Sequence, residues 1–508
     1  MNRPYNKNYN FAVGEGQFLR SKFATERSGV CLPPPVNNEI LITKIIQFSR
    51  KEVNTLQKER KLKFSTTQTI LLSFLGVILI GSILLSLPIS SATGKSVPFL
   101  DALFTATTST CVTGLVTLPT VSTWSLFGQI VILVLIQIGG LGFIAIVSGL
   151  MILLTRRMGI GHKLLIQDAF NLNTMEGLSK FIRNVLLGTF FIEALGAALC
   201  MTVFVPQFGK RGIWISVFHS ISAFCNAGID IFAENSLCDY ATNPIINIVT
   251  SALIILGGIG YIVWWDVLRV IRSGAIQKGH FWAHLTLHSK IAITTSAALI
   301  FGGGLLILMS EFNNPATIGE MSFFDKIQVS LFQSVTTRTA GFASVPQENL
   351  RDTTSIISMA MMLVGGSPVG TAGGLKTVTI AVLLCSAFAT IRNKREATLF
   401  GRRISSDSIR RAVAVVVVFG CFALVSTTLL AAATKANLLD VIYESVSAIA
   451  TVGLSRNFTG SLNAVGKLIV IVTMYLGRVG PISLAVALGS DNESQNVISA
   501  PEEDISIG

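Results

Sequence analysis

The sequence predicts an all-α polytopic membrane protein, and three observations support that fold class. Apolar residues make up 51% of the 508 residues and charged residues only 13%, whereas soluble domains carry about 25% charged residues. Uncharged runs cover 102–155, 240–265, 353–375 and 412–434. Each run is long enough to cross a bilayer core, which takes about 20 residues. Finally, glycine-containing loops recur along the chain at a nearly constant spacing.

The net charge of +12 would suit nucleic-acid binding, but the distribution of the charge indicates membrane orientation instead. The segments 38–64, 155–183, 266–290 and 392–411 hold 23 Lys and Arg residues, and the segments expected on the other side hold eight. Cytoplasmic loops of membrane proteins are enriched in Lys and Arg. We therefore expect a multi-pass protein of the cell membrane (the inner or plasma membrane) with both termini in the cytoplasm and no nucleic-acid partner.

The chain is expected to open with a cytoplasmic extension, 1–64, which holds no spanning segment. The first repeat, 65–155, then has a spanning helix at 68–87 and a stretch at 101–109 that is too short to span, which we call a half-helix. A loop and a return helix at 126–154 complete it. The later repeats have the same order of spanning helix, half-helix and return segment. In the second repeat, 178–266, these are expected at 182–204, 213–224 and 245–265. In the third repeat, 288–391, they are expected at 291–309, 323–336 and 354–386, and in the fourth, 408–489, at 412–433, 438–449 and 467–488. Residues 490–508 are expected to be a cytoplasmic tail.

Two glycine landmarks recur once in every repeat. The loop glycines fall at positions 114, 228, 341 and 453, with spacings of 114, 113 and 112 residues. The return segments carry Gly139-Gly140, Gly257-Gly258, Gly365-Gly366, and Gly477 with Gly480. Because the basic linkers all fall on one side, the repeats run in parallel, which favours an axis along the membrane normal. The sequence thus predicts four parallel helix–pore-loop–helix repeats in a pseudo-four-fold arrangement around one central pore.

The loops have the composition of an ion filter. Thr451-Val452-Gly453 is the core of a sequence whose backbone carbonyls replace the hydration shell of an ion. Irregular backbone at membrane depth is tolerated only where protein buries it or where it lines water. Half-helices that point their C-terminal ends at one axis favour a cation there. The candidate filter residues are Val112, Thr113, Gly114, Asn226, Ala227, Gly228, Thr339, Ala340, Gly341, Thr451, Val452 and Gly453. The return-segment glycines fit either close helix packing or direct contact with the ion.

The third return segment differs from the others. Residues 365–374 contain five glycines and a proline, so they cannot continue as a helix. A break in one repeat predicts a flexible obstruction next to the filter, and so a gate; the alternative is a packed helix break. A phosphate loop is rejected because Leu375 separates Gly374 from Lys376. The candidate gate residues are Gly366, Ser367, Pro368, Gly370, Thr371, Gly373, Gly374, Lys376 and Arg478.

Charges within apolar segments need partners or a function. Arg478 is expected to donate to free carbonyls of the gate segment, and Arg338 either braces its loop or faces the pore. Glu193 is expected to be paired. Three aspartates lie near the starts of half-helices, where they either attract cations or cap the helices: Asp101, Asp325 and Asp440. His280, His284 and His288 share a helical face, which is solvated or could bind metal. Since the sequence has no HExxH or GxSxG motif, no enzyme activity is expected.

These features together resemble one known family. The matching stretches are 101–115, 219–228, 332–342, 365–377, 451–454 and 477–481. Over roughly 65–489 the chain resembles the membrane subunit of the Ktr/Trk potassium uptake family, part of the superfamily of potassium transporters, and it is most similar to the KtrB type. The extension of about 64 residues before the first repeat is longer than that type leads us to expect.

The resemblance implies a potassium-selective pore with one K+ site at Gly114, Gly228, Gly341 and Gly453. It implies a gate at 365–376 that is held by Arg478. It also implies a homodimer in membrane lipid, docked on a cytoplasmic ring of nucleotide-binding regulatory subunits. Activation by Na+ is common in such systems, and no organic cofactor is expected on this chain.

Overall fold

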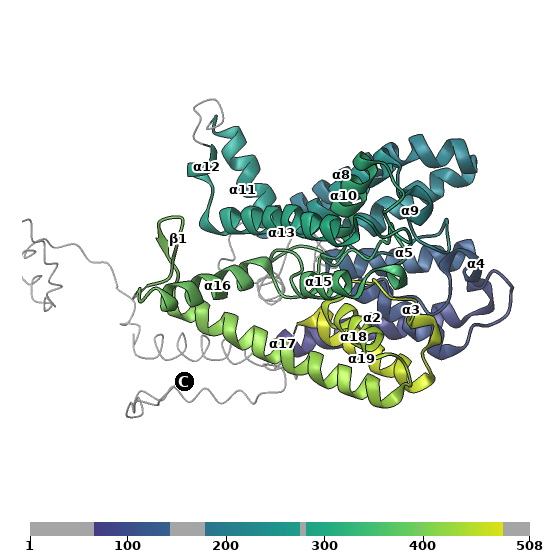
Figure 1. Cartoon of the computed structure of the whole chain (residues 1–508). Helices are drawn as coiled ribbons and strands as arrows, with labels where there is room; N and C mark the ends of the chain where they lie inside the picture. The colour runs from purple at the N-terminus through teal and green to yellow at the C-terminus, as the bar shows by residue number, and fades with distance from the viewer. Residues whose placement is uncertain (1–65, 143–177, 275–280, 395, 481–508) are drawn as a thin grey trace, which may run out of the picture. The chain divides into compact units, whose positions relative to one another are not determined.

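The computed structural model describes residues 66–142, 178–274, 281–394 and 396–480, and these are mainly helical (Figure 1). Within them, four helices are long and apolar enough to cross a membrane alone. Each opens one of the expected repeats: α2 (Thr66–Ser86), α8 (Leu178–Phe208), α13 (Leu287–Glu311) and α17 (Ser406–Ala433). The N-terminal extension, the linker 143–177, the C-terminal tail and His280 lie outside the described residues.

A half-helix follows each spanning helix. The four are α3 (Phe99–Cys111), α9 (Lys210–Cys225), α14 (Phe323–Thr336) and α18 (Leu438–Ala450). The longest has 16 residues, or about 24 Å at 1.5 Å per residue, which is shorter than the roughly 30 Å bilayer core. The Asn437 side chain accepts from the backbone N–H of Leu439 and so caps the start of α18.

The return segments are broken more often than the sequence predicts. They consist of α5 (Leu126–Leu141), α10 (Pro244–Gly258) with α11 (Tyr261–Arg272), α15 (Asp352–Leu363) with α16 (Thr377–Ile391), and α19 (Ala464–Val479). The prediction of one helix at 245–265 is wrong, because α10 and α11 meet at 98°. The physical reason is Gly260, whose φ of +91° does not belong to a helix. Gly142 and Gly480 end α5 and α19 with φ of +85° and +91°, and the expected continuations to 154 and 488 lie outside the described residues.

Short elements lie within the repeats and between them. They are α4 (Thr120–Thr123), α12 (Phe281–His284), the 3-10 turns η1 (Pro88–Ser90), η2 (Cys238–Tyr240), η3 (Gln347–Asn349) and η4 (Thr459–Ser461), and the hairpin of β1 (Thr398–Leu399) and β2 (Arg402–Arg403). The hairpin joins α16 to α17, so it lies between the third and fourth repeats.

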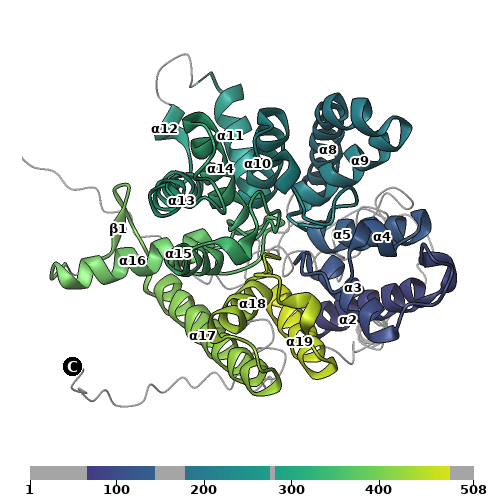
Figure 2. The same ribbon diagram turned by 45° about the vertical axis from the view of Figure 1, so that its right-hand side comes forward.

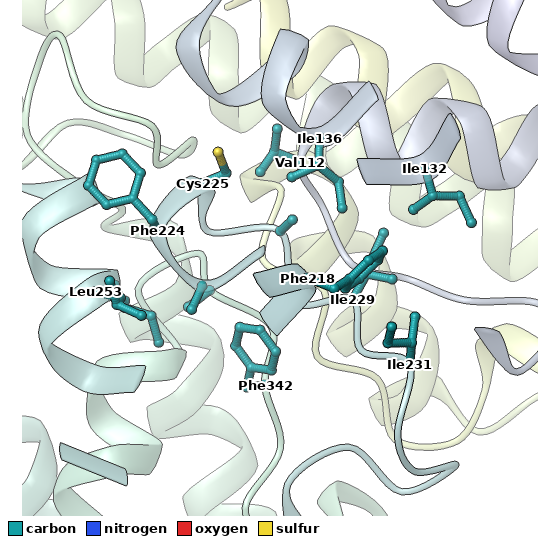
Figure 3. Packing of buried hydrophobic residues seen from close by; sticks show 14 of the residues in the cluster. Val112, Ile132, Ile136, Phe218, Phe224, Cys225, Ile229, Ile231, Leu253 and Phe342 are labelled. Atoms are coloured by element: carbon teal, nitrogen blue, oxygen red, sulfur yellow. The ribbon is translucent and has the colours of Figure 1, made fainter. Parts of the chain in front are cut away.

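The four repeats surround a common centre, at which their loops meet (Figure 2). The large apolar residue that follows each loop glycine is buried, with an exposed fraction of 2% or less: Leu115, Ile229, Phe342 and Leu454. Ile229 and Phe342 belong to the same buried cluster as Val112 and Cys225 (Figure 3). Burial of these side chains fixes the loops in place. The all-α, four-repeat arrangement predicted from the sequence is confirmed.

Candidate functional site

The four central loops share one backbone pattern. The residue two positions before each loop glycine has a left-handed φ: +55° at Val112, +60° at Asn226, +65° at Thr339 and +52° at Thr451. The glycines have positive φ as well, from +63° to +102°. Left-handed φ is uncommon outside glycine, especially for β-branched Val and Thr. The pattern therefore indicates loops whose backbone direction is held by the surrounding structure, as a carbonyl-lined site requires.

A hydroxyl group from each half-helix ties down the loop that follows it. Gly114 N donates to Thr108 Oγ1 at 2.9 Å, and Gly453 N donates to Ser447 Oγ at 3.0 Å. In the other two repeats the hydroxyls of Ser222 and Thr336 bond to the residue after the glycine. The sequence reasoning missed these four residues. Their signal was present, because a Ser or Thr precedes the loop glycine by six residues in three repeats and by five in the third.

The four loop glycines form a closed ring. A Cβ atom added to Gly114 would lie 2.6 Å from the carbonyl oxygen of Ala227, the residue before the next loop glycine. Equivalent contacts join Gly228 to Ala340, Gly341 to Val452 and Gly453 to Thr113. Each ring glycine thus lies beside a carbonyl of the next repeat around the ring, and a side chain at any of the four positions would collide with that neighbour. The structure brings together the residues that the sequence proposed as a filter.

Two buried hydroxyls near this ring are free to bind a ligand. The Oγ1 atoms of Thr113 and Thr451 are buried and have no hydrogen-bond partner in the described part of the chain. Thr113 and Thr451 each lie one or two residues before a ring glycine. An unpaired buried hydroxyl is costly unless an ion or water supplies the missing contact. The two hydroxyls are thus buried acceptors next to ring glycines, and the one of Thr451 also lies against Gly373.

The return-segment glycines pack against the half-helices. A Cβ atom at Gly139, Gly257 or Gly477 would overlap a backbone carbonyl near the end of a half-helix, at Thr110, Phe224 and Ile449 respectively. Such overlaps explain why these positions lack a side chain. Of the two interpretations left open by the sequence, these contacts support close packing for all three glycines.

A cavity of about 410 Å³ opens on one side of the ring, and all four ring glycines line it. We call this cavity the vestibule. Three carboxylates line it, Asp230, Glu234 and Glu348, and its described lining contains no Lys or Arg. Burial raises the pKa of Asp230 to about 7. The acidic lining without a described Lys or Arg favours a cation in the vestibule, although the raised pKa of Asp230 reduces its share of the negative charge near neutral pH.

The three aspartates at the starts of half-helices are placed elsewhere. Asp101 accepts from Lys467 Nζ at 2.5 Å and from Thr117 Oγ1 at 3.0 Å. Asp440 accepts from Arg456 Nε at 2.8 Å, and Asp325 accepts from the hydroxyl of its N-cap residue. None of the three lines the vestibule. The structure therefore gives no support to the cation-attraction alternative for them.

The glycine-rich segment 365–376, here called the gate loop, lies on the other side of the ring from the vestibule. Its two ends are paired, with Gly365 N donating to Leu375 O at 2.9 Å. Its middle reaches the filter, where Gly373 N donates to Thr339 Oγ1 at 3.2 Å and Gly373 Cα lies against the Thr451 side chain. Lys376 Nζ donates to Ala372 O at 2.7 Å within the loop. The loop thus lies directly against candidate filter residues of two repeats, Thr339 and Thr451.

Arg478 joins this loop to the first repeat. Its Nη1 donates to Thr371 O at 2.6 Å, and its Nη2 donates to Gly139 O. The sequence anticipated a donation to the gate loop but not the contact with Gly139. Arg478 is the side chain that links the gate loop, the first return helix and α19.

The other charged residues singled out in the sequence do not line the vestibule. Arg338 Nη2 donates to Ser296 Oγ of α13 at 3.0 Å, which places its guanidinium behind its loop. Glu193 accepts from Gln137 Nε2 at 3.1 Å and is therefore paired. His284 and His288 belong to no group of three potential metal ligands within the described residues.

Comparison with known proteins gives a family match over nearly the whole chain. Residues 36–499 match the TrkH family, which is described as "Cation transport protein". The chain is 38% identical to "Potassium/sodium uptake protein NtpJ" of Enterococcus hirae, over 89% of this chain and all of that one. It is 36% identical to "Ktr system potassium uptake protein B" of Bacillus subtilis, again over 89% of this chain and all of that one.

Among solved structures, the fold is similar to the crystal structure of the potassium transporter TrkH from Vibrio parahaemolyticus. The TM-score is 0.67, with 16% sequence identity, and the match covers 85% of this chain and 87% of that one. At that identity the likeness concerns the arrangement of helices, which agrees with the four repeats described above.

Proposed function

Because the chain belongs to the TrkH family of cation transport proteins, we propose that it is the potassium-selective translocation subunit of a gated uptake system. Membership of this family makes the chain a transport protein rather than an enzyme. The names of its relatives, which refer to potassium or to potassium and sodium uptake, support K+ as the cargo.

The observation that supports a filter most strongly is the closed ring of glycine–carbonyl contacts. Four loops contribute one glycine each, and the carbonyls of Thr113, Ala227, Ala340 and Val452 lie next to those glycines. We propose that carbonyls of these loops replace the hydration shell of one K+ at the ring. The C-terminal ends of the four half-helices point at the same place and add favourable negative potential.

The gate loop is proposed to close the path beyond the filter. Its contacts with Thr339 and Thr451 support this role, because they place the loop against residues that precede two ring glycines. Arg478 would hold it closed by donating to Thr371 O. Opening would then require the loop to leave these partners, whose groups must find water or other protein atoms in exchange.

We also propose an orientation in the membrane and partner subunits for this chain, on the basis of its family. The vestibule would face the outside, and the basic linkers the cytoplasm. The word "system" in the name of the Bacillus subtilis relative supports a partner complex. We propose a homodimer in membrane lipid, regulated by a cytoplasmic ring of nucleotide-binding subunits and open to activation by Na+.

Substitution in the ring tests the filter. In cells that lack their own potassium uptake, the unmodified chain should restore growth at low K+. Gly114→Ala should abolish that growth, because its Cβ atom would lie 2.6 Å from Ala227 O and its φ is +102°. Gly94→Ala is the matched control, since Gly94 also has a positive φ, of +70°, but no neighbour within 4 Å. Growth with Gly114→Ala that equals growth with Gly94→Ala, at equal membrane levels, would sink the filter assignment.

A further inference from the structure

The corner between α10 and α11, residues 257–260, leaves two backbone carbonyls without their helical partners. In a continuous helix, the carbonyls of Gly257 and Gly258 would accept hydrogen bonds from the N–H groups of Tyr261 and Ile262, four residues on. The 98° bend at this corner prevents those bonds. Such carbonyls cannot remain unpaired at membrane depth without a large cost.

The gate loop supplies the missing donors. Ser367 N donates to Gly258 O at 2.8 Å, and Thr371 N donates to Gly257 O at 3.1 Å. In return, Tyr261 N, which a straight helix would use internally, donates to Val369 O at 2.9 Å. Three backbone hydrogen bonds thus tie the third repeat's loop to the second repeat's corner.

We propose that this corner is a second anchor of the gate loop, and that α11 and the loop compete for the same two carbonyls. The proposal rests on the function proposed above for residues 365–376. Straightening α10 and α11 would form the helical bonds to Gly257 O and Gly258 O and would break all three bonds to the loop. The released N–H groups of Ser367 and Thr371 would then need water, which reaches them when the pore is open. Two alternative sets of hydrogen bonds make the corner a two-state element.

The bent state is held at two points, just before α11 and in its middle. At its start, Gly260 has a φ of +91°, and a Cβ atom there would collide with Pro368 O of the gate loop. Further along, Asp266 accepts from Thr286 N at 2.9 Å and from Thr286 Oγ1 at 2.8 Å. Thr286 caps the start of α13, so Asp266 fixes α11 to the next spanning helix. A change at Gly260 or at Asp266 should favour release of the loop.

Gly260→Ala tests the anchor, because an alanine disfavours the positive φ and collides with the loop. The full chain is purified and reconstituted in liposomes without any partner, and Rb+ influx is measured. We expect influx to rise about tenfold, the factor that corresponds to a loss of about 1.4 kcal/mol, near the net contribution of one or two hydrogen bonds. Gly142→Ala is the matched control, because Gly142 has a φ of +85° but no neighbour within 4 Å among the described residues. It should leave influx unchanged.

Deletion of residues 367–373 separates this inference from the function on which it rests. If the deletion fails to raise influx, the proposed gate is wrong, whatever the corner does. If the deletion raises influx and Gly260→Ala does not, the gate stands and the anchor is overturned. The anchor would also be overturned if Gly142→Ala raised influx as much as Gly260→Ala does. The same holds if adding Gly260→Ala to the deletion raised influx further. Should Gly260→Ala not fold, Asp266→Ala replaces it, with the same expected rise and the same contradicting results.

Discussion

The loops depend on single residues in unusual backbone conformations. Val112, Thr339 and Thr451 are β-branched, yet each has a left-handed φ. Such conformations cost about 1–3 kcal/mol each and persist only where the surroundings hold them. The hydroxyls of Thr108 and Ser447 supply part of that support, because each accepts from a ring glycine. Loop residues in strained conformations are thus held by hydroxyls of the half-helices.

Ser447→Ala should therefore reduce selectivity without blocking transport. The change removes the acceptor of Gly453 N and leaves the ring glycines in place. Loss of about 1 kcal/mol at this position corresponds to roughly fivefold weaker discrimination of K+ against Na+. Competition of Na+ with Rb+ uptake measures the effect. Thr428→Ala removes an exposed hydroxyl on α17 and should have no effect; equal results for the two variants would contradict this role of Ser447.

Asp230 gives the vestibule a dependence on pH. Burial raises its pKa to about 7, so its charge is lost as the outside pH falls from 8 to 6. Protonation removes one of the three carboxylates that line the vestibule, which weakens cation attraction. Uptake from low K+ should fall about two- to fivefold over this pH range, the size expected for a modest electrostatic effect.

Asp230→Asn should have lower uptake at pH 8 and lose most of this dependence. Glu234→Gln is the control, because it removes a neighbouring vestibule charge and leaves Asp230 to titrate. Initial rates of Rb+ uptake at several outside pH values distinguish the two variants. An unchanged pH profile for Asp230→Asn would show that another group titrates.

At the scale of elements, the ring of repeats has to be closed between the first and the last. Lys467 at the start of α19 donates to Asp101 at the start of α3, and both side chains are largely buried. The half-helix and return helix of different repeats are thereby joined by an ion pair. Arg456 similarly joins the fourth repeat to the third. It pairs with Asp440 of the fourth repeat and donates to Ser355 Oγ of the third at 2.5 Å.

Lys467→Met should destabilise the fold by about 3 kcal/mol, because it leaves the buried Asp101 carboxylate without its cation. Adding Asp101→Asn should recover part of the loss. Arg410→Met is the control: its partner Asp407 and Arg410 itself are both exposed, so no measurable change is expected. Thermal unfolding in detergent measures all of these variants. A loss with Lys467→Met no greater than with Arg410→Met would show that the pair does not stabilise the ring.

At the scale of the whole molecule, the sequence was most informative where the repeats share a feature. The spacing of Gly114, Gly228, Gly341 and Gly453 predicted four loops around one axis, and the short apolar stretches before them predicted the half-helices. These features recur because each repeat has to bring one glycine loop to the common axis. The bend at Gly260 was missed, since a glycine in an apolar run is equally consistent with close packing.

Features that belong to one repeat were harder to predict. The vestibule charge comes from Asp230, Glu234 and Glu348, in loops of the second and third repeats whose sequences do not recur. The contacts between the gate loop and residues 257–260 join segments more than 100 residues apart. Nothing in either segment alone identifies its partner, so these contacts required the structure.

We propose that one ring of four loops selects K+ along a single path. The most direct test is ion replacement with the purified chain, carrying the 367–373 deletion, in liposomes that contain K+, Rb+ or Na+ gradients. The account predicts comparable fluxes of K+ and Rb+, at least about tenfold lower flux of Na+, and loss of all three with Gly114→Ala. Equal fluxes of Na+ and K+, or K+ flux that is unaffected by Gly114→Ala, would contradict it.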